Sequence, residues 1–339
     1  MTGMPDPTPQ QPTGTPDGTD TRPAWPQDLS VWATAQSTGP VQRRGRYVPQ
    51  SVKHPARMLP AIAAHAVRSY TQPGDLVLDP MCGIGTTIVE AIHAHRDAIG
   101  VEYESRWSDI ADLNITHAHR HGATGRGSVI RGDATRLTAL LPAALQGQVS
   151  LVVTSPPYGP TVHGLVRPGI DGVTKSDNRY GDDKGNLAYR NSLTALVDGF
   201  TDILRGCHTL LRPGGVVVVT ARPWRKRGEL VDLPSAVLAA GTAAGFTPLE
   251  RCVALLAAVR GGRLIARPSF FQLQQVRKAR SSGVPMHLIA HEDVLVLGKL
   301  EKSASSAEPK CSRCGPGCPD GSSCHADTGV HGNSGRRTS

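Results

Sequence analysis

Residues 76–87 of the chain read Leu-Val-Leu-Asp-Pro-Met-Cys-Gly-Ile-Gly-Thr-Thr. The apolar run at the start of this stretch predicts a short buried strand, which ends at Asp79-Pro80. Gly83 and Gly85 predict a tight turn, and Thr86-Thr87 is typical of the start of a helix. A strand that is joined to a helix by a glycine-containing turn is the repeating unit of a parallel α/β sheet.

The same alternation of strand and helix extends in both directions from this unit. A helical pattern precedes it at residues 55–70, and strand patterns follow at 98–101, 128–131, 150–153, 216–219, 249–259 and 293–298. Predicted helices of ten or more residues between most of these strands indicate βαβ crossovers. The sequence therefore predicts a doubly wound, mostly parallel, Rossmann-like α/β sheet with helices on both faces.

Composition separates a folded body from two polar ends. Residues 1–45 are rich in proline and threonine, and residues 303–339 are rich in Ser, Gly, Pro and Cys, so both ends are expected to be disordered. Residues 46–302 form the predicted domain, in which 159–186 and 261–285 are inserted loops. Apolar runs stay shorter than the ~18 residues that span a bilayer, and no signal-peptide pattern is present, so a cytoplasmic protein is expected.

Positive charge is concentrated in the second half of the chain. The formal net charge is +9, and the stretches 205–228 and 251–291 contain basic residues but no acidic ones. This pattern favours a polyanionic partner such as nucleic acid, with a solvated basic surface as the alternative. Phosphate contacts and base stacking are expected from Arg222, Trp224, Arg225, Lys226, Arg227, Arg263 and Arg267.

The first loop favours a nucleoside cofactor that has no phosphate. Glu102 follows Gly85 by 17 residues, the distance at which a carboxylate can hold ribose hydroxyls. The third glycine of the dinucleotide fingerprint is missing, and Asp79 would repel a pyrophosphate. S-adenosyl-L-methionine instead carries an ammonium and a sulfonium, and Asp133, after the third strand, could accept a hydrogen bond from its adenine. A purely structural turn is the alternative.

The second loop, Ser155-Pro156-Pro157-Tyr158, follows the strand at 150–153. Consecutive prolines remove two N–H donors and fix φ, so nearby carbonyls stay free as acceptors. The exocyclic amine of a base needs such acceptors, because its lone pair is delocalised into the ring. We expect the Ser155 side chain and the Pro156 carbonyl to accept from the amine, and Tyr158 to stack on the base for ~1–3 kcal/mol.

The two loops together resemble the amino-methylating DNA methyltransferase family (N4-cytosine and N6-adenine), over about residues 50–300. The resemblance implies that 79–87 hold the methionine part of S-adenosyl-L-methionine, that Glu102 holds the ribose and that Asp133 holds the adenine. It assigns the target amine to Ser155, Pro156, Pro157 and Tyr158, and residues 53–57 are similar to the element that closes over the methionine end. The expected cofactor-binding residues are His54, Asp79, Pro80, Met81, Cys82, Gly83, Gly85, Thr86, Thr87, Glu102, Tyr103, Asp133 and Ala134.

Within that family, a serine before Pro-Pro-Tyr favours cytosine N4 over adenine N6. DNA is the expected partner, and a restriction endonuclease is a candidate second one. RNA is the alternative, because Pro-Met-Cys-Gly at 80–83 also resembles RNA guanine-N2 methyltransferases, which carry aspartate where this chain has Ser155. A third alternative is a non-catalytic nucleic-acid-binding protein with the same fold.

The sequence assigns no metal to the folded body, because its histidines lack ligand spacing. Four cysteines crowd the end of the chain at Cys311, Cys314, Cys318 and Cys324. These cysteines either bind a zinc ion or belong to a disordered tail. The scarcity of apolar residues around them favours the disordered tail.

Overall fold

The computed structural model describes residues 29–157, 165–169, 172–176, 181, 183, 185–190, 192–226, 229–268 and 270–301, and all structural statements below concern this part of the chain. Apart from Glu301, these residues belong to the unit Met1–Leu300. No helix among them is long and apolar enough to cross a membrane.

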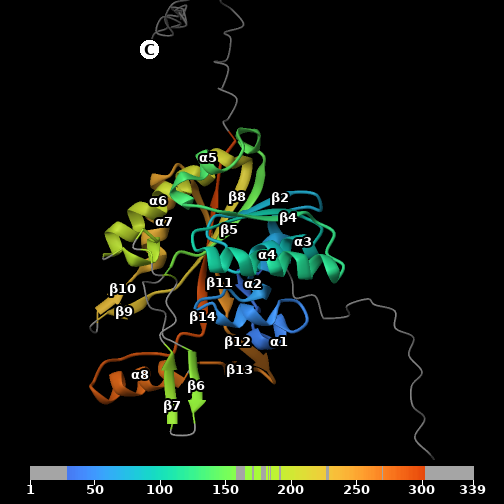
Figure 1. Ribbon diagram of the computed structural model, residues 1–339. Coiled ribbons are helices and arrows are strands. Elements are labelled where there is room, and N and C mark those ends of the chain that lie inside the picture. Colours follow the sequence, from blue (N-terminus) through green and yellow to red (C-terminus); the bar gives the residue numbers. More distant parts are fainter. Residues whose placement is uncertain are drawn as a thin grey trace, which may run out of the picture. The chain divides into compact units, whose positions relative to one another are not determined.

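A single eight-stranded sheet organises the unit (Figure 1). Its strands, in spatial order, are β1 (Val31–Trp32), β11 (Thr247–Leu255), β14 (His291–Gly298), β8 (Leu211–Ala221), β5 (Val149–Thr154), β2 (Leu76–Asp79), β3 (Asp97–Glu102) and β4 (Gly127–Arg131). Neighbouring strands are parallel except for β14, which runs antiparallel to both β8 and β11. The predicted doubly wound, mostly parallel, Rossmann-like α/β fold is confirmed.

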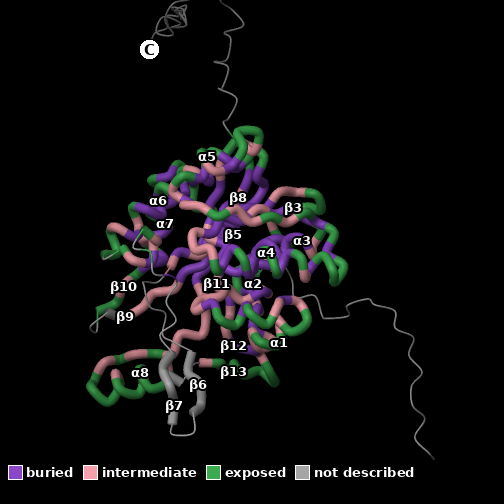
Figure 2. The backbone as a smooth tube through the Cα atoms, in the orientation of Figure 1, coloured by how far each residue is buried: buried purple, intermediate pink, exposed green. Residues whose placement is uncertain are grey.

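Helices cover both faces of the sheet. One face packs against α2 (Pro60–Tyr70), α3 (Thr86–His93) and α4 (Ser105–Arg120), and the other against α5 (Leu137–Leu140), α6 (Leu193–Leu210) and α7 (Leu233–Ala243). Side chains alternate between the faces along each strand, so Val218 joins the first apolar cluster while Val217 and Val219 join the second. The central strands are therefore buried on both sides, as the colouring of β5 and β8 in Figure 2 shows.

Smaller elements decorate this core. They are α1 (Gly39–Arg43), α8 (Phe270–Ser281), the 3-10 helices at Pro49–Lys53, Ala134–Arg136, Ala143–Leu145 and Leu187–Tyr189, and the strand pairs β6 (Leu165–Gly169) with β7 (Gly172–Ser176), β9 (Trp224–Lys226) with β10 (Glu229–Val231), and β12 (Ala257–Arg260) with β13 (Arg263–Ala266). The segments expected as inserted loops thus contain regular structure: β6 and β7 lie in the first, and β13 and α8 lie in the second. The single strand expected at 249–259 is divided between β11 and β12.

Part of the segment expected to be disordered is folded. Residues 29–45 contain β1 and α1, so the prediction of disorder over 1–45 is wrong for them, and residues 1–28 and 302–339 lie outside the described residues. Trp32 is 2% exposed, and its ring lies 4.2 Å from the ring of His65. The Thr34 hydroxyl donates to the Leu255 carbonyl at 2.9 Å. A few anchors that pair with a sheet edge are enough to order a segment whose average composition is polar.

Candidate active site

The predicted site residues meet at one edge of the sheet. Parallel strands place their carboxyl ends side by side, so the strand order also orders the loops. Along this edge lie Asp133 after β4, Glu102 at the end of β3, Asp79 at the end of β2, Ser155 after β5 and Arg222 after β8. All five line one cavity of about 420 Å³. The two loops that the sequence singles out therefore share a cleft.

Most, but not all, of the predicted residues line this cavity. Its walls include His54, Asp79, Pro80, Met81, Cys82, Gly83, Thr86, Thr87, Glu102, Tyr103, Asp133, Ala134, Ser155, Pro156, Pro157 and Arg222. Gly85 instead precedes α3, and Trp224, Arg225, Arg263 and Arg267 are described but do not line the cavity. Tyr158, Arg227 and the side chain of Lys226 lie outside what the structure describes, so their assigned roles stay predictions.

The glycine loop needs glycine at both predicted positions. Gly83 has a φ of 54° and Gly85 a φ of 78°, values that residues with a Cβ rarely adopt. A Cβ on Gly83 would also lie 3.0 Å from the Nε2 atom of His54. The loop therefore passes close under the imidazole, and its backbone forms part of the cavity wall.

Asp79 ties the end of β2 to the start of α3. Its Oδ1 accepts from the Met81 N–H at 3.1 Å, and its Oδ2 accepts from the Thr87 hydroxyl at 2.7 Å. Burial raises the pKa of Asp79 to about 6, although these hydrogen bonds favour the charged form. The carboxyl group thus fixes the loop and still faces the cavity with unused acceptor capacity.

Glu102 has a comparable position on the neighbouring strand. Its two oxygens accept from the Gly83 and Glu104 backbone N–H groups, each at 2.8 Å. Burial, more than the nearby acidic groups, raises the pKa of Glu102 to about 7. Asp133 accepts from the Thr135 N–H at 2.9 Å and caps a 3-10 helix. Two buried carboxyl groups with raised pKa values in one cavity favour a ligand that carries positive charge.

His54 closes the cavity above the glycine loop. It is 5% exposed, and its ring packs edge-on against the ring of Trp107 at a centroid distance of 4.7 Å. Burial lowers the pKa of His54 to about 3, so the ring is neutral at physiological pH. Trp107, from α4, also lines the cavity, although nothing in the sequence marks it as a site residue. Its position in the helix pattern is that of an ordinary core residue.

Asn114 connects the segment that carries His54 to the glycine loop. This fully buried α4 residue accepts from the Val48 N–H at 2.8 Å and donates to the Ile84 carbonyl at 2.8 Å. It also exchanges hydrogen bonds with the Ser51 hydroxyl. The segment that carries His54 and the glycine loop are thereby joined through one side chain. A polar residue within the apolar face of a predicted helix was the available signal for it.

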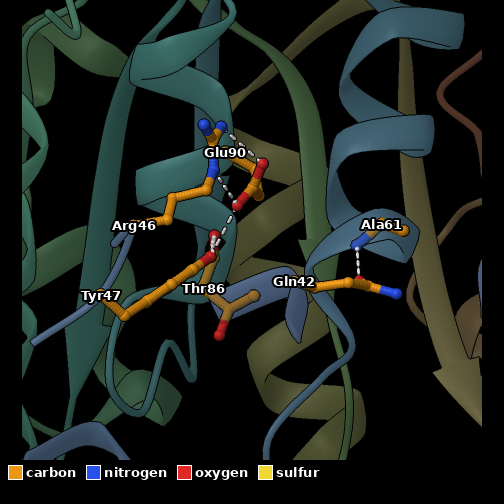
Figure 3. A network of polar contacts seen from close by, with 6 residues as sticks. All are labelled: Gln42, Arg46, Tyr47, Ala61, Thr86 and Glu90. Atoms are coloured by element: carbon orange, nitrogen blue, oxygen red, sulfur yellow. Dashed lines mark hydrogen bonds and ion pairs between the residues drawn. The ribbon is translucent and has the colours of Figure 1, made fainter. Parts of the chain in front are cut away.

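A second buried network anchors the N-terminal segment behind the loop (Figure 3). Glu90 of α3 is 4% exposed and accepts from the Arg46 Nε atom at 2.8 Å and its Nη2 atom at 2.7 Å. The Tyr47 hydroxyl donates to the same carboxylate at 2.8 Å. Nearby, the Gln42 side chain accepts from the Ala61 N–H at 3.0 Å. These contacts explain why the chain before residue 59 is held against α2 and α3.

Comparison with known proteins agrees with this geometry. A family model described as DNA methylase, for N6- and N4-acting enzymes, matches residues 6–112, which include the glycine loop and Glu102. Residues 6–112 are therefore similar to the amino-methyltransferase family. It is 31% identical over 89 residues to the type II methyltransferase M.HinfI of Haemophilus influenzae, a match that covers 26% of this chain and 24% of that protein.

Another curated relative is named for a different substrate. The chain is 34% identical over 180 residues to a tRNA (guanine(10)-N2)-dimethyltransferase of Methanothermobacter thermautotrophicus, covering 53% of this chain and 43% of that protein. The solved structure of TrmN from Thermus thermophilus aligns with a TM-score of 0.44 at 20% identity, over 77% of this chain and 53% of that one. The chain spans less than half the length of the curated relatives it matches.

The cofactor of the matched methyltransferase family is S-adenosyl-L-methionine, and the cavity fits it. The two buried carboxyl groups suit a cationic ligand, and the backbone of the glycine loop gives close access. Glu102 and Asp133, at the ends of adjacent strands, are the candidates to hold ribose and adenine, and Asp79 the ammonium. When bound, the cofactor supplies a methyl group that its sulfonium already activates.

Proposed function

We propose that the chain transfers a methyl group from S-adenosyl-L-methionine to the exocyclic amine of a nucleic-acid base. One observation carries the proposal: the Ser155-Pro156-Pro157 loop lines the same cavity as Asp79 and Glu102. Because one cavity would hold both the methyl donor and the amine, their close positioning would supply much of the rate enhancement.

The diproline loop is suited to hold an amine. The Pro156 side chain is buried and Ser155 is partly exposed to the cavity, where its hydroxyl can accept a hydrogen bond. Two acceptors, the Ser155 hydroxyl and the Pro156 carbonyl, would engage both N–H groups of the amine. That arrangement draws the nitrogen lone pair out of conjugation with the ring and towards the methyl donor. The proposal requires no metal and no covalent intermediate.

DNA cytosine N4 is the first candidate for the target. Ser155, in place of an acidic or amide residue, supports N4 within the family, and the M.HinfI relative is named a type II methyltransferase. A restriction endonuclease partner remains a prediction. Guanine N2 in RNA is the second candidate, because the match over 180 residues is to an enzyme named for that reaction.

Exposed basic side chains support a nucleic-acid substrate. Arg263 and Arg267, on and beside β13, are exposed and belong to the acid-free stretch 251–291. Trp224 and Arg225, in β9, follow the strand that leads to the cavity edge. We propose these residues, with the two inserted segments 159–186 and 261–285, as the surface that grips phosphates and recognises the target.

Product analysis tests the proposal. The protein is incubated with labelled S-adenosyl-L-methionine and either duplex DNA or RNA, which is then digested to nucleosides and separated. The expected product is N4-methylcytosine in DNA. Label in N2-methylguanine of RNA alone would overturn the DNA assignment and support the second candidate. Label in neither nucleic acid, together with tight cofactor binding by calorimetry, would leave a binding protein without transfer activity.

A further inference from the structure

The cavity continues past the diproline loop, on the side away from the cofactor residues. Beyond Ser155, which follows β5, the next strands along the edge are β8, β14 and β11. They contribute Thr220, Arg222, Glu292 and Leu256 to the cavity wall. The three strands therefore contribute the Arg222 guanidinium and the Glu292 carboxyl group to the wall beside the loop proposed to hold the target amine.

Strand register places the two charged residues together. Asp293 pairs with Ala221 and Val294 pairs with Thr220 in the antiparallel β14–β8 ladder. Continuing this register by one residue puts Glu292 opposite Arg222, on the same face of the sheet. Burial raises the pKa of Glu292, and the Arg222 guanidinium opposes that rise because the two charges are close. A carboxyl group beside a guanidinium restricts the directions in which the guanidinium points its donors.

The order of chemical groups along the edge discriminates between bases. The Ser155 hydroxyl and the Pro156 carbonyl, in the loop after β5, are acceptors. The next group along the edge is the Arg222 guanidinium, a donor, which follows the neighbouring strand β8. In cytosine the N4 amine is followed along the Watson–Crick edge by two acceptors, N3 and O2. In adenine the N6 amine is followed by the single acceptor N1. In guanine the N2 amine is followed by the N1–H donor, which would face the donors of Arg222 and remain unpaired.

We infer that Arg222, oriented by Glu292, is a specificity-determining residue that reads the N3 and O2 acceptors of the target cytosine. This inference rests on the proposed function and names the base that its cavity selects. It gives Arg222 a different role from the phosphate contact that its position in a basic segment predicts. Arg222 lines the cavity, whereas its neighbours Trp224 and Arg225 do not.

Substitution of Arg222 tests the inference. Arg222→Met removes the donors, and Arg222→Lys keeps the charge but loses the bidentate geometry. With oligonucleotides that offer either one cytosine or one adenine in the methylated position, both variants should lower kcat/KM for cytosine by about 5- to 150-fold, the range for loss of a bidentate base contact. The ratio of cytosine to adenine methylation should fall in parallel, while the Kd for S-adenosyl-L-methionine stays unchanged.

Arg126→Gln is the matched control. Arg126 is exposed, pairs with Asp97, and lies before β4, at the opposite edge of the sheet from the cavity. Its loss removes the same charge and should leave the base ratio and kcat/KM unchanged. Unchanged cofactor binding by the Arg222 variants shows that they are folded.

Glu292 is tested as a positioning residue. Glu292→Gln should lower the cytosine-to-adenine ratio, and Glu292→Asp should partly restore it. In the double variant with Arg222→Met, Glu292→Gln should cause no further loss, because both act through one contact. If Glu292 had a purely structural role, the losses caused by Glu292→Gln and Arg222→Met would add in the double variant.

The failures of the inference and of the proposed function are distinguishable. If the wild-type protein methylates neither DNA nor RNA, the proposed function is wrong. If the wild-type protein methylates DNA but Arg222→Met weakens DNA binding for all sequences with an unchanged base ratio, Arg222 contacts phosphate and the inference is overturned. An unchanged kcat/KM in both Arg222 variants overturns it as well.

Discussion

At the scale of single residues, the proposed function depends mainly on two side chains. Asp79 is buried, faces the cavity and holds the glycine loop, while Ser155 starts the diproline loop on the next strand. Their adjacency follows from the parallel pairing of β2 with β5, which brings the two strand ends together. Each can be tested by a single substitution.

Ser155→Ala should lower kcat by about 10²-fold, because one acceptor of the amine is lost from the position where charge develops on transfer. The Kd for S-adenosyl-L-methionine, measured by calorimetry, should not change. Ser128→Ala is the control, since Ser128 is exposed on β4 and does not line the cavity. Full activity in Ser155→Ala would show that the hydroxyl does not contact the target.

Asp79→Asn should change the pH dependence of stability. The pKa of Asp79 is raised from 3.8 to about 6 in the folded protein, so the fold binds this proton more tightly than the unfolded chain does. The resulting stabilisation is present below about pH 4 and is lost as the pH rises through 6. The wild-type protein should therefore lose about 3 kcal/mol relative to the variant between pH 4 and pH 7 in urea titrations. A pH-independent difference would contradict the buried position of this carboxyl group.

At the scale of elements, the site depends on contacts between segments distant in the sequence. Asn114 on α4 links Val48, before the first 3-10 helix, to Ile84 in the glycine loop. Glu90 on α3 anchors Arg46 and Tyr47 in the same way. The N-terminal segment is thus part of the cofactor wall, because it positions His54 above Gly83.

Asn114→Ala should destabilise the protein by about 2–4 kcal/mol, because it leaves a buried N–H and a buried carbonyl without partners. It should also weaken binding of S-adenosyl-L-methionine, since the loop and the His54 segment lose their connection. Leu113→Ala, at an exposed position of the same helix, should change the free energy of unfolding by less than about 0.5 kcal/mol. Equal effects of the two substitutions in urea unfolding would contradict the linking role of Asn114.

Features that depend on local backbone chemistry could be predicted from the sequence. Gly83 and Gly85 have positive φ values, and the prolines after Ser155 end a strand, so both loops and their place at strand ends were predictable. The hydrogen bond from the Gly83 N–H to Glu102 and those of Asn114 were not, because they join residues 19 or more positions apart. The folding of residues 29–45 was missed because its anchors, such as Trp32 and Thr34, are few and average composition conceals them.

At the scale of the whole molecule, the proposed function requires the basic surface and the cavity to act on the same polymeric substrate. The basic stretches 205–228 and 251–291 contain no acidic residue, and the first of them leads to Arg222 at the cavity edge. The proposed function therefore expects binding to be driven by release of counterions from phosphates and to weaken as salt rises.

Replacing Arg263 and Arg267 together by Gln should lower DNA affinity similarly for all sequences. The slope of log Kd against log salt concentration should become shallower by about 2, one unit for each phosphate contact. Fluorescence anisotropy with two unrelated duplexes measures both quantities. A slope equal to that of the wild-type protein would exclude these side chains from the phosphate-binding surface.

The central claim is that one cavity holds both the methyl donor and the target amine. A compound in which the cofactor skeleton is joined, at the position of the transferred methyl group, to the N4 atom of cytosine would occupy both halves at once. The calorimetric Kd of this compound should lie at least about 10²-fold below that of S-adenosylhomocysteine, and Ser155→Ala should reduce that advantage. If the joined compound binds no more tightly than S-adenosylhomocysteine, the two sites are separate and the claim is wrong.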